Sequence, residues 1–213
     1  FWEYNPTIVA ARDLEKNGTW LGLSKNNNNS TFRLSALTNF RSTENKEYEH
    51  SRGDITQYFL DSNLGALEYT QQIPFSSYAG FNALFFDGSS LVYCHHEVNK
   101  TPDIYTLDKG IYGLSNAKLN SPWPKVEKTK KAFQTLAGHE THKMSAEHLF
   151  SFLRDDTLAE DKLLPNTGVG IELERMLSPA FIVSPSYGTR TASVVIIDKQ
   201  ENQQSVYFTE RQF

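Results

Sequence analysis

The order in which strand and helix patterns follow one another is what most limits the folds open to this chain. Strand patterns come first, helical patterns follow over residues 51–71, strands return over 81–116, helices over 125–154, and strands again from residue 181. Strands that return in groups, rather than alternating singly with helices, predict an α+β layered fold. The 213 residues suffice for one domain with a substantial core, and neither a repeat nor a linker divides them.

Turn and capping signals locate the individual elements. Asn17-Gly18 and Asp87-Gly88 are turn dipeptides, because Asn and Gly tolerate the positive φ angles of tight hairpins. Phe32–Asn39 alternates residue by residue between two faces, which is typical of a half-buried strand. Ser51 to Asp54 has the S-x-x-D form of a helix N-terminus. The expected strands are Thr19–Ser24, Phe32–Asn39, Phe81–Phe86, Leu91–His95, Ile111–Asn116, Phe181–Val183, Thr189–Asp198 and Ser205–Thr209; helices are expected near 51–59, 64–71, 125–136 and 145–154, and a loop over 155–170.

Charge and cysteine content exclude several classes of function. A net charge of −4 and an isoelectric point near 5.9 lack the basic field of a nucleic-acid-binding protein. No apolar run approaches the ~20 residues that a membrane-spanning helix needs, so no integral membrane segment is expected. Cys94 is the only cysteine, which excludes an intrachain disulfide and favours a reducing, cytoplasmic location.

The common catalytic and metal-binding motifs are incomplete. Gly113–Ala117 begins like a G-x-S-x-G nucleophile elbow but lacks its last glycine. His139 and His142 have an H-x-x-H spacing without a matching third ligand, so we expect a surface turn and no metal site. Cys94 and His96 share a face of one expected strand, which is compatible with a metal or haem. A buried cysteine beside an edge histidine is the simpler interpretation.

Three polar residues stand at the ends of expected strands. Asn39 ends one strand, Asn116 ends another, and Arg190 opens a third. An asparagine amide held in a dry site can stabilise a developing oxyanion, and an arginine can orient a nucleophile or bind a carboxylate. The alternative is structural, because asparagine at a strand end commonly caps a turn.

Eight short segments occur in an order that is typical of one family. The segments are Gly18-Thr19-Trp20-Leu21-Gly22, Ala36-Leu37-Thr38-Asn39-Phe40-Arg41, Ser51-Arg52-Gly53, Gly80-Phe81-Asn82, Tyr112-Gly113-Leu114-Ser115-Asn116-Ala117, Pro122-Trp123-Pro124-Lys125, Tyr187-Gly188-Thr189-Arg190-Thr191 and Phe208-Thr209-Glu210-Arg211. Together they resemble the NRDE family, also called the transport and Golgi organisation 2 family, over the whole chain.

The resemblance implies both a fold and a catalytic apparatus. The family is similar to N-terminal nucleophile hydrolases of the choloylglycine hydrolase and penicillin V acylase type. It therefore implies a four-layer αββα sandwich of two mainly antiparallel sheets flanked by helices. In such enzymes an N-terminal cysteine is the nucleophile and its own α-amine, with a pKa near ~8, is the general base. By resemblance, Asn39 is the oxyanion-hole residue, Asn116 binds near the nucleophile's amine, and Arg190 closes the site.

Two function hypotheses follow from this resemblance. The first is hydrolysis of a linear amide (C–N) bond by a cysteine that the resemblance places upstream of Phe1. These 213 residues by themselves are then expected to be inactive. The second is a non-catalytic carrier, since family members are linked to haem trafficking and to lipid and acyl-CoA homeostasis. Trp20, Asn82 and His96 are the candidate ligand-binding residues, and the expected ligand is a small amide, haem or a lipid.

Overall fold

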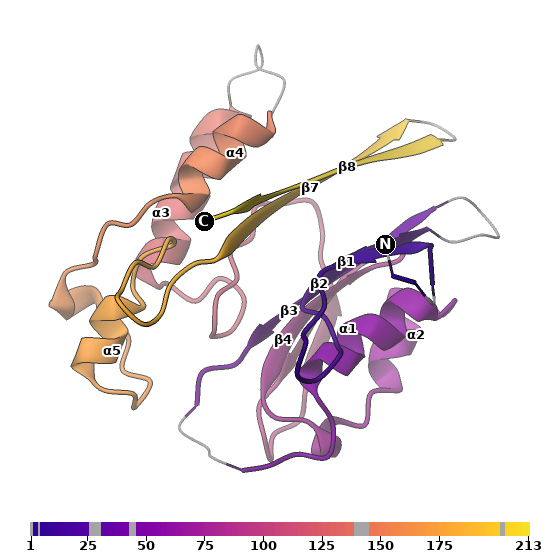
Figure 1. The fold of residues 1–213 in the computed structure, drawn as a ribbon, viewed down its shortest axis with the longest axis horizontal. Coiled ribbons are helices and arrows are strands. Elements are labelled where there is room, and N and C mark those ends of the chain that lie inside the picture. The colour runs from indigo at the N-terminus through magenta and orange to yellow at the C-terminus, as the bar shows by residue number, and fades with distance from the viewer. Residues whose placement is uncertain (1, 4, 26–30, 43–45, 139–144, 201–202) are drawn as a thin grey trace. The chain divides into compact units, whose positions relative to one another are not determined.

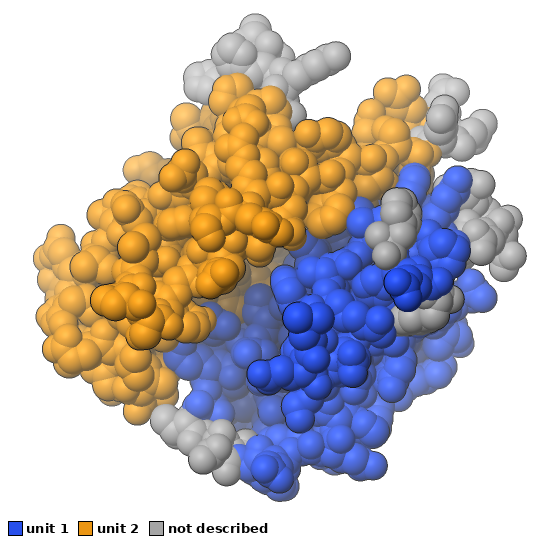
Figure 2. Space-filling view, viewed as in Figure 1, with its two compact units in different colours: residues 1–110, 116–118 blue, residues 111–115, 119–213 orange. Residues whose placement is uncertain are grey.

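The fold was taken from a computed structural model that describes residues 2–3, 5–25, 31–42, 46–138, 145–200 and 203–213 (Figure 1). The chain divides into two compact units, which are coloured separately in Figure 2. The first unit comprises Phe1–Gly110 with Asn116–Lys118, and the second comprises Ile111–Ser115 with Leu119–Phe213. A further turn that the sequence predicts at Asn26–Asn29, and the His139/His142 spacing, fall outside the described residues.

The first unit is built on a six-stranded antiparallel sheet whose strands are ordered as they occur in the sequence. Each strand therefore pairs with its neighbours in the chain, as hairpin signals predict. The alternating Phe32–Asn39 segment lies between two neighbours in this sheet. The strands are β1 (Ile8–Ala10), β2 (Leu21–Lys25), β3 (Phe32–Asn39), β4 (Phe81–Phe86), β5 (Leu91–His96) and β6 (Asp103–Thr106).

Two helices, α1 (Arg52–Asp61) and α2 (Ala66–Gln71), cover one face of this sheet, and a short 3₁₀ turn, Phe75–Ser77, follows them (Figure 1). The predicted capping box is present, because the Ser51 side chain accepts from Gly53 and Asp54 accepts from the Ser51 backbone N–H. The core lies between the helices and the sheet. At its aromatic centre Phe59, Tyr69 and Phe85 pack in T-shaped and tilted contacts at ring separations of 4.9–5.3 Å.

A buried arginine closes the C-terminal end of α1. Arg33 of β3 is 2% exposed, and its guanidinium donates to the carbonyl oxygens of Phe59 and Leu64 and to the Ser62 hydroxyl. The guanidinium carbon also lies 4.1 Å from the centre of the Phe59 ring. The last turn of α1 contains no basic residue of its own. Arg33 therefore supplies the positive charge and the donors that the unpaired carbonyls of a helix end require.

The second unit contains three helices and a β-hairpin. Helix α4 packs on β7, and Phe150 contacts Ala192 and Val194 in its small core. Ser145 caps α4 by accepting from the His148 N–H. The elements are α3 (Pro124–Ala137), α4 (Ala146–Leu153), a 3₁₀ turn at Asp161–Leu163, α5 (Ile171–Met176), β7 (Thr191–Gln200) and β8 (Gln203–Gln212). The described residues thus form an α+β structure with one six-stranded and one two-stranded antiparallel sheet, which confirms the predicted class.

Two local predictions were wrong, and one helix was missed. Residues Ile111–Asn116 form no strand, because Gly113 packs so tightly against α3 that a Cβ there would lie 2.6 Å from Val126 Cγ1. The last strand of the sheet is instead β6, before the Asp108–Gly110 turn. Phe181–Val183 is a loop anchored by the Phe181 N–H on the Asp155 carbonyl oxygen, and α5 was not anticipated.

None of the helices in the described ranges combines the length and apolar character that a membrane-spanning segment needs.

Candidate functional site

Four polar residues form a row across the first unit's sheet, on the face opposite α1 and α2. Backbone pairing places Thr38 of β3 beside Asn82 of β4, Asn82 beside His95 of β5, and His95 beside Asp103 of β6. Side chains alternate between the two faces of a strand, and Phe81, Ala83 and Cys94, which adjoin Asn82 and His95 in the sequence, belong to the core beneath the helices. Asn82 and His95 therefore lie on the opposite face. We call Thr38, Asn82, His95 and Asp103 the polar row.

Asn82 is the centre of the polar row and is fully buried. Its side-chain oxygen lies 2.8 Å from the Tyr93 hydroxyl, which donates to it, and 2.9 Å from His95 Nδ1. Its amide group donates to the Thr38 hydroxyl over 3.4 Å. Because an amide oxygen only accepts, the His95 Nδ1 must carry the proton, and Nε2 then carries a lone pair.

The surroundings of His95 keep its imidazole neutral. Burial lowers the pKa of His95, the positive charge of Lys118 lowers it further, and Asp103 opposes the shift. His95 is 2% exposed, and its Nε2 makes no hydrogen bond within the described residues. The edge of the Phe40 ring faces the imidazole at a centroid separation of 5.0 Å. A neutral, oriented imidazole of this kind can accept a hydrogen bond or a proton.

An exposed ion pair ends the polar row. Lys118 Nζ lies 2.7 Å from Asp103 Oδ2, and this hydrogen bond lowers the pKa of Asp103. Both side chains are about half exposed, so the pair contributes little stability by itself. Its effect is positional, because it fixes the segment Asn116–Lys118 at β6.

The same segment is fixed at the end of β3, where two sequence-predicted site residues meet. The Asn116 side-chain amide donates to the Asn39 carbonyl oxygen at 2.9 Å, and the Asn116 carbonyl accepts from the Arg41 N–H at 2.7 Å. Asn116 thus holds the backbone at two points, Asn39 and Arg41. Asn39 itself is exposed.

The remaining predicted residues belong to other elements of the fold. Trp20 precedes β2, is 44% exposed, and accepts from the Leu37 N–H through its carbonyl. Asn82 is in the polar row. Arg190 belongs to the second unit, is exposed, and accepts from the Phe213 N–H through its carbonyl.

The Cys94/His96 face is the helix-covered face. His96 is 4% exposed and packs against Phe75 and Phe81 at ring separations of 5.3 and 5.5 Å. Cys94 is fully buried, and burial raises its pKa to about 12, so the thiol stays protonated. Within the described ranges no group of three or more His, Cys, Asp or Glu side chains could hold a metal ion.

Sequence analysis missed His95 and Tyr93, although a signal for both was present. Alternation in Leu91–His96 places them on one face, and Asn82 is the polar exception in the otherwise apolar strand Phe81–Phe86. A polar residue inside a buried strand needs hydrogen-bonding partners on the neighbouring strands. That requirement points to the strand that follows in the hairpin, where Tyr93 and His95 lie.

Comparison with known proteins places the chain among relatives of one kind. It matches the family Transport and Golgi organisation 2 over residues 1–213. It is 31% identical to the human Transport and Golgi organization protein 2 homolog over 226 aligned residues, which cover 99% of this chain and 79% of the human protein. The mouse homolog is 29% identical with the same coverage. The Drosophila melanogaster Transport and Golgi organization protein 2 is 25% identical, covering 93% of this chain and 75% of its own length. The chain therefore belongs to the Transport and Golgi organisation 2 family.

Proposed function

We propose that the protein hydrolyses a linear amide bond at the end of β3, and that its two units form one αββα domain of the N-terminal nucleophile hydrolase type. The observation that carries the proposal is the Asn39–Asn116 arrangement. The backbone at Asn39 is clamped while its side-chain amide stays exposed. A donor whose backbone is already held needs less reorganisation, which favours stabilisation of an oxyanion.

The nucleophile in this proposal is not one of the described side chains. Cys94 is buried with its pKa raised to about 12, so no thiolate is available there. The family resemblance assigns the role to an N-terminal cysteine outside these 213 residues. Its α-amine has a pKa near ~8, close to neutral pH, and can therefore accept the thiol proton.

Each proton transfer in the reaction then has a defined acceptor. The thiolate attacks the amide carbonyl, and the Asn39 amide donates to the oxygen that becomes negative. The C–N bond breaks as the protonated α-amine returns its proton to the leaving amine. Water then attacks the thioester, releases the carboxylic acid and regenerates the thiol. Arg190 is assigned by resemblance to the closure of this site.

The test uses the full-length protein and a panel of N-acyl amides. We expect Asn39→Ala to lower kcat by about 10²–10³-fold, as the loss of an oxyanion donor does elsewhere. Asn63→Ala is the matched control, because Asn63 is an exposed asparagine in the loop between α1 and α2. The proposal fails if Asn39→Ala and Asn63→Ala have equal rates, or if replacing the N-terminal cysteine by serine leaves the rate unchanged.

A further inference from the structure

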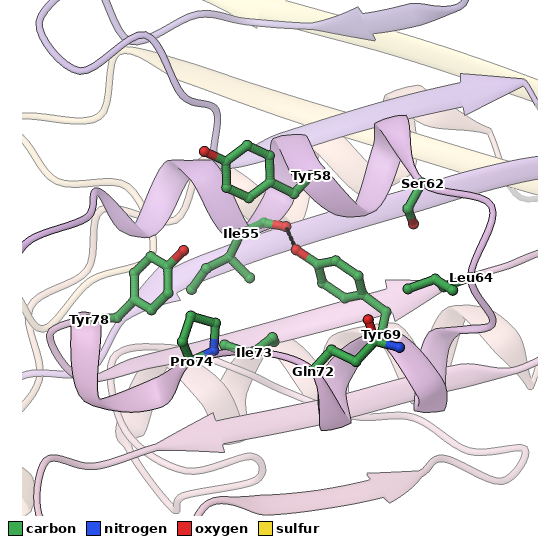
Figure 3. Close-up of a pocket in the computed structure, with 9 residues that line it drawn as sticks. All are labelled: Ile55, Tyr58, Ser62, Leu64, Tyr69, Gln72, Ile73, Pro74 and Tyr78. Atoms are coloured by element: carbon green, nitrogen blue, oxygen red, sulfur yellow. Dashed lines mark hydrogen bonds between the residues drawn. The ribbon is translucent and has the colours of Figure 1, made fainter.

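A cavity of about 260 Å³ lies between α1 and the segment that runs from α2 to Tyr78 (Figure 3). Its floor is formed by buried side chains, Ile55, Tyr69, Ile73 and Tyr78, each 9% exposed or less. The cavity lies on the helix side of the first unit's sheet, whereas the polar row lies on the opposite face. None of the residues that line it is part of the Asn39–Asn116 arrangement at which hydrolysis is proposed.

The lining is mainly apolar and aromatic, with Ser62 and Gln72 as its polar members, and none of the described residues that line it is charged. The rings of Tyr69 and Tyr78 come from opposite ends of the space, and the exposed Tyr58 ring stands at its rim (Figure 3). Aromatic walls favour a flat ligand, because ring faces and edges pack closely against another ring. A charged ligand would lose its hydration without gaining a counter-ion.

One hydroxyl group in the cavity can donate a hydrogen bond and so orient a ligand. The Tyr69 hydroxyl is already committed, since it donates to the Ile55 carbonyl oxygen at 2.6 Å. The Tyr78 hydroxyl makes no hydrogen bond within the described residues, and Figure 3 shows it pointing toward α1. Burial and the nearby Asp54 carboxylate raise the pKa of Tyr78 to about 12. The Tyr78 phenol therefore remains a donor at neutral pH, and Asp54 disfavours an anion beside it.

We propose that this cavity binds a neutral aromatic carbonyl compound, with its ring between the tyrosines and its oxygen accepting from the Tyr78 hydroxyl. The size of the ligand follows from the volume of the cavity. A 150 Å³ apolar cavity holds benzene, so 260 Å³ accommodates about ten non-hydrogen atoms.

The test is a titration of the ¹⁵N-labelled chain with three probes, followed by two-dimensional amide NMR. Propiophenone carries the ring and the acceptor, propylbenzene lacks the acceptor, and benzoate carries a charge. We expect propiophenone to shift the amide resonances of Ile55 and Ile73 with an affinity about fivefold above that of propylbenzene, as one net hydrogen bond gives. Benzoate should shift neither resonance.

Two matched variants locate the hydrogen bond. Tyr78→Phe should weaken propiophenone binding about fivefold and leave propylbenzene binding unchanged. Tyr58→Phe removes a phenol from the exposed rim and should change neither affinity by as much as twofold. The proposal is overturned if propiophenone leaves the Ile55 and Ile73 resonances in place, or if it binds the Tyr78→Phe variant as tightly as the parent. Should Tyr78→Phe not fold, equal binding of propiophenone and propylbenzene to the parent chain overturns the proposal.

Discussion

Replacing Asn82 by alanine is the most direct test of the polar row. The substitution removes the one oxygen that accepts from both the Tyr93 hydroxyl and His95 Nδ1. Both donors are on side chains no more than 2% exposed, so water cannot readily replace the lost acceptor. Both donors would lose this acceptor in a buried environment, which is costlier than losing an exposed hydrogen bond.

The expected magnitude follows from these two donors. Losing the acceptor of a buried donor costs about 1–3 kcal/mol, and Asn82 accepts from two, so Asn82→Ala should lower the free energy of unfolding by about 4 kcal/mol. For a chain of this length the Tm falls by about 2–4 °C per kcal/mol, which predicts a decrease of about 10 °C. Asn82→Asp retains the acceptor oxygens and should recover part of this loss. Its carboxylate should also raise the pKa of His95.

Thermal unfolding monitored by circular dichroism measures the first effect, and an NMR titration of the His95 imidazole measures the second. Asn63→Ala is again the control, because this exposed asparagine should change stability by less than about 0.5 kcal/mol. The reasoning would be refuted by an Asn82→Ala protein that unfolds at the same temperature as Asn63→Ala. A His95 pKa that does not rise in Asn82→Asp would refute the proposed contact.

Two further outcomes are expected. His95 has a pKa below its ordinary value of 6.5, caused by burial and then by Lys118. The unfolded state therefore binds more protons, and stability is lost as pH falls through 6.5 and below. The unfolding midpoint of His95→Gln should fall less between pH 7 and pH 5 than that of the parent, and equal slopes would contradict this assignment. Separately, Gly18→Ala should lower the free energy of unfolding, measured with urea, by about 1–3 kcal/mol, because a Cβ there would lie 2.6 Å from the Gly53 carbonyl carbon. Gly138→Ala, whose nearest contact would be 3.4 Å, serves as its control, and similar midpoints for the two variants would contradict the proposed close approach.

Local patterns predicted the elements whose causes are local. The β3 and β4 bounds match the predicted Phe32–Asn39 and Phe81–Phe86 because alternation and apolar runs act within a single strand. The start of α1 at Ser51 was predicted because its capping box involves only the next three residues. The turn at Asn17-Gly18 is likewise local, since Asn17 adopts a φ of 61°.

Predictions failed where packing between distant segments decides the conformation. Residues 111–116 have a strand-like composition, yet the approach of Gly113 to Val126 keeps this backbone out of the sheet. Alternation places Arg33 on one face of its strand, but only the packing of the end of α1 against that face buries its guanidinium. Neither contact partner is near in sequence, so no local pattern signals either outcome.

The sequence by itself determined the α+β class, the family, and the placement of Asn39 at a strand end. The tertiary structure alone decided which polar residues meet. Register across four strands brings Thr38, Asn82, His95 and Asp103 into one row. The hydrogen bond from the Asn116 side chain holds the end of β3. The physical reason is that alternation assigns each residue to one of two faces. Only the hydrogen-bonded pairing of strands determines which residue of the next strand lies beside it.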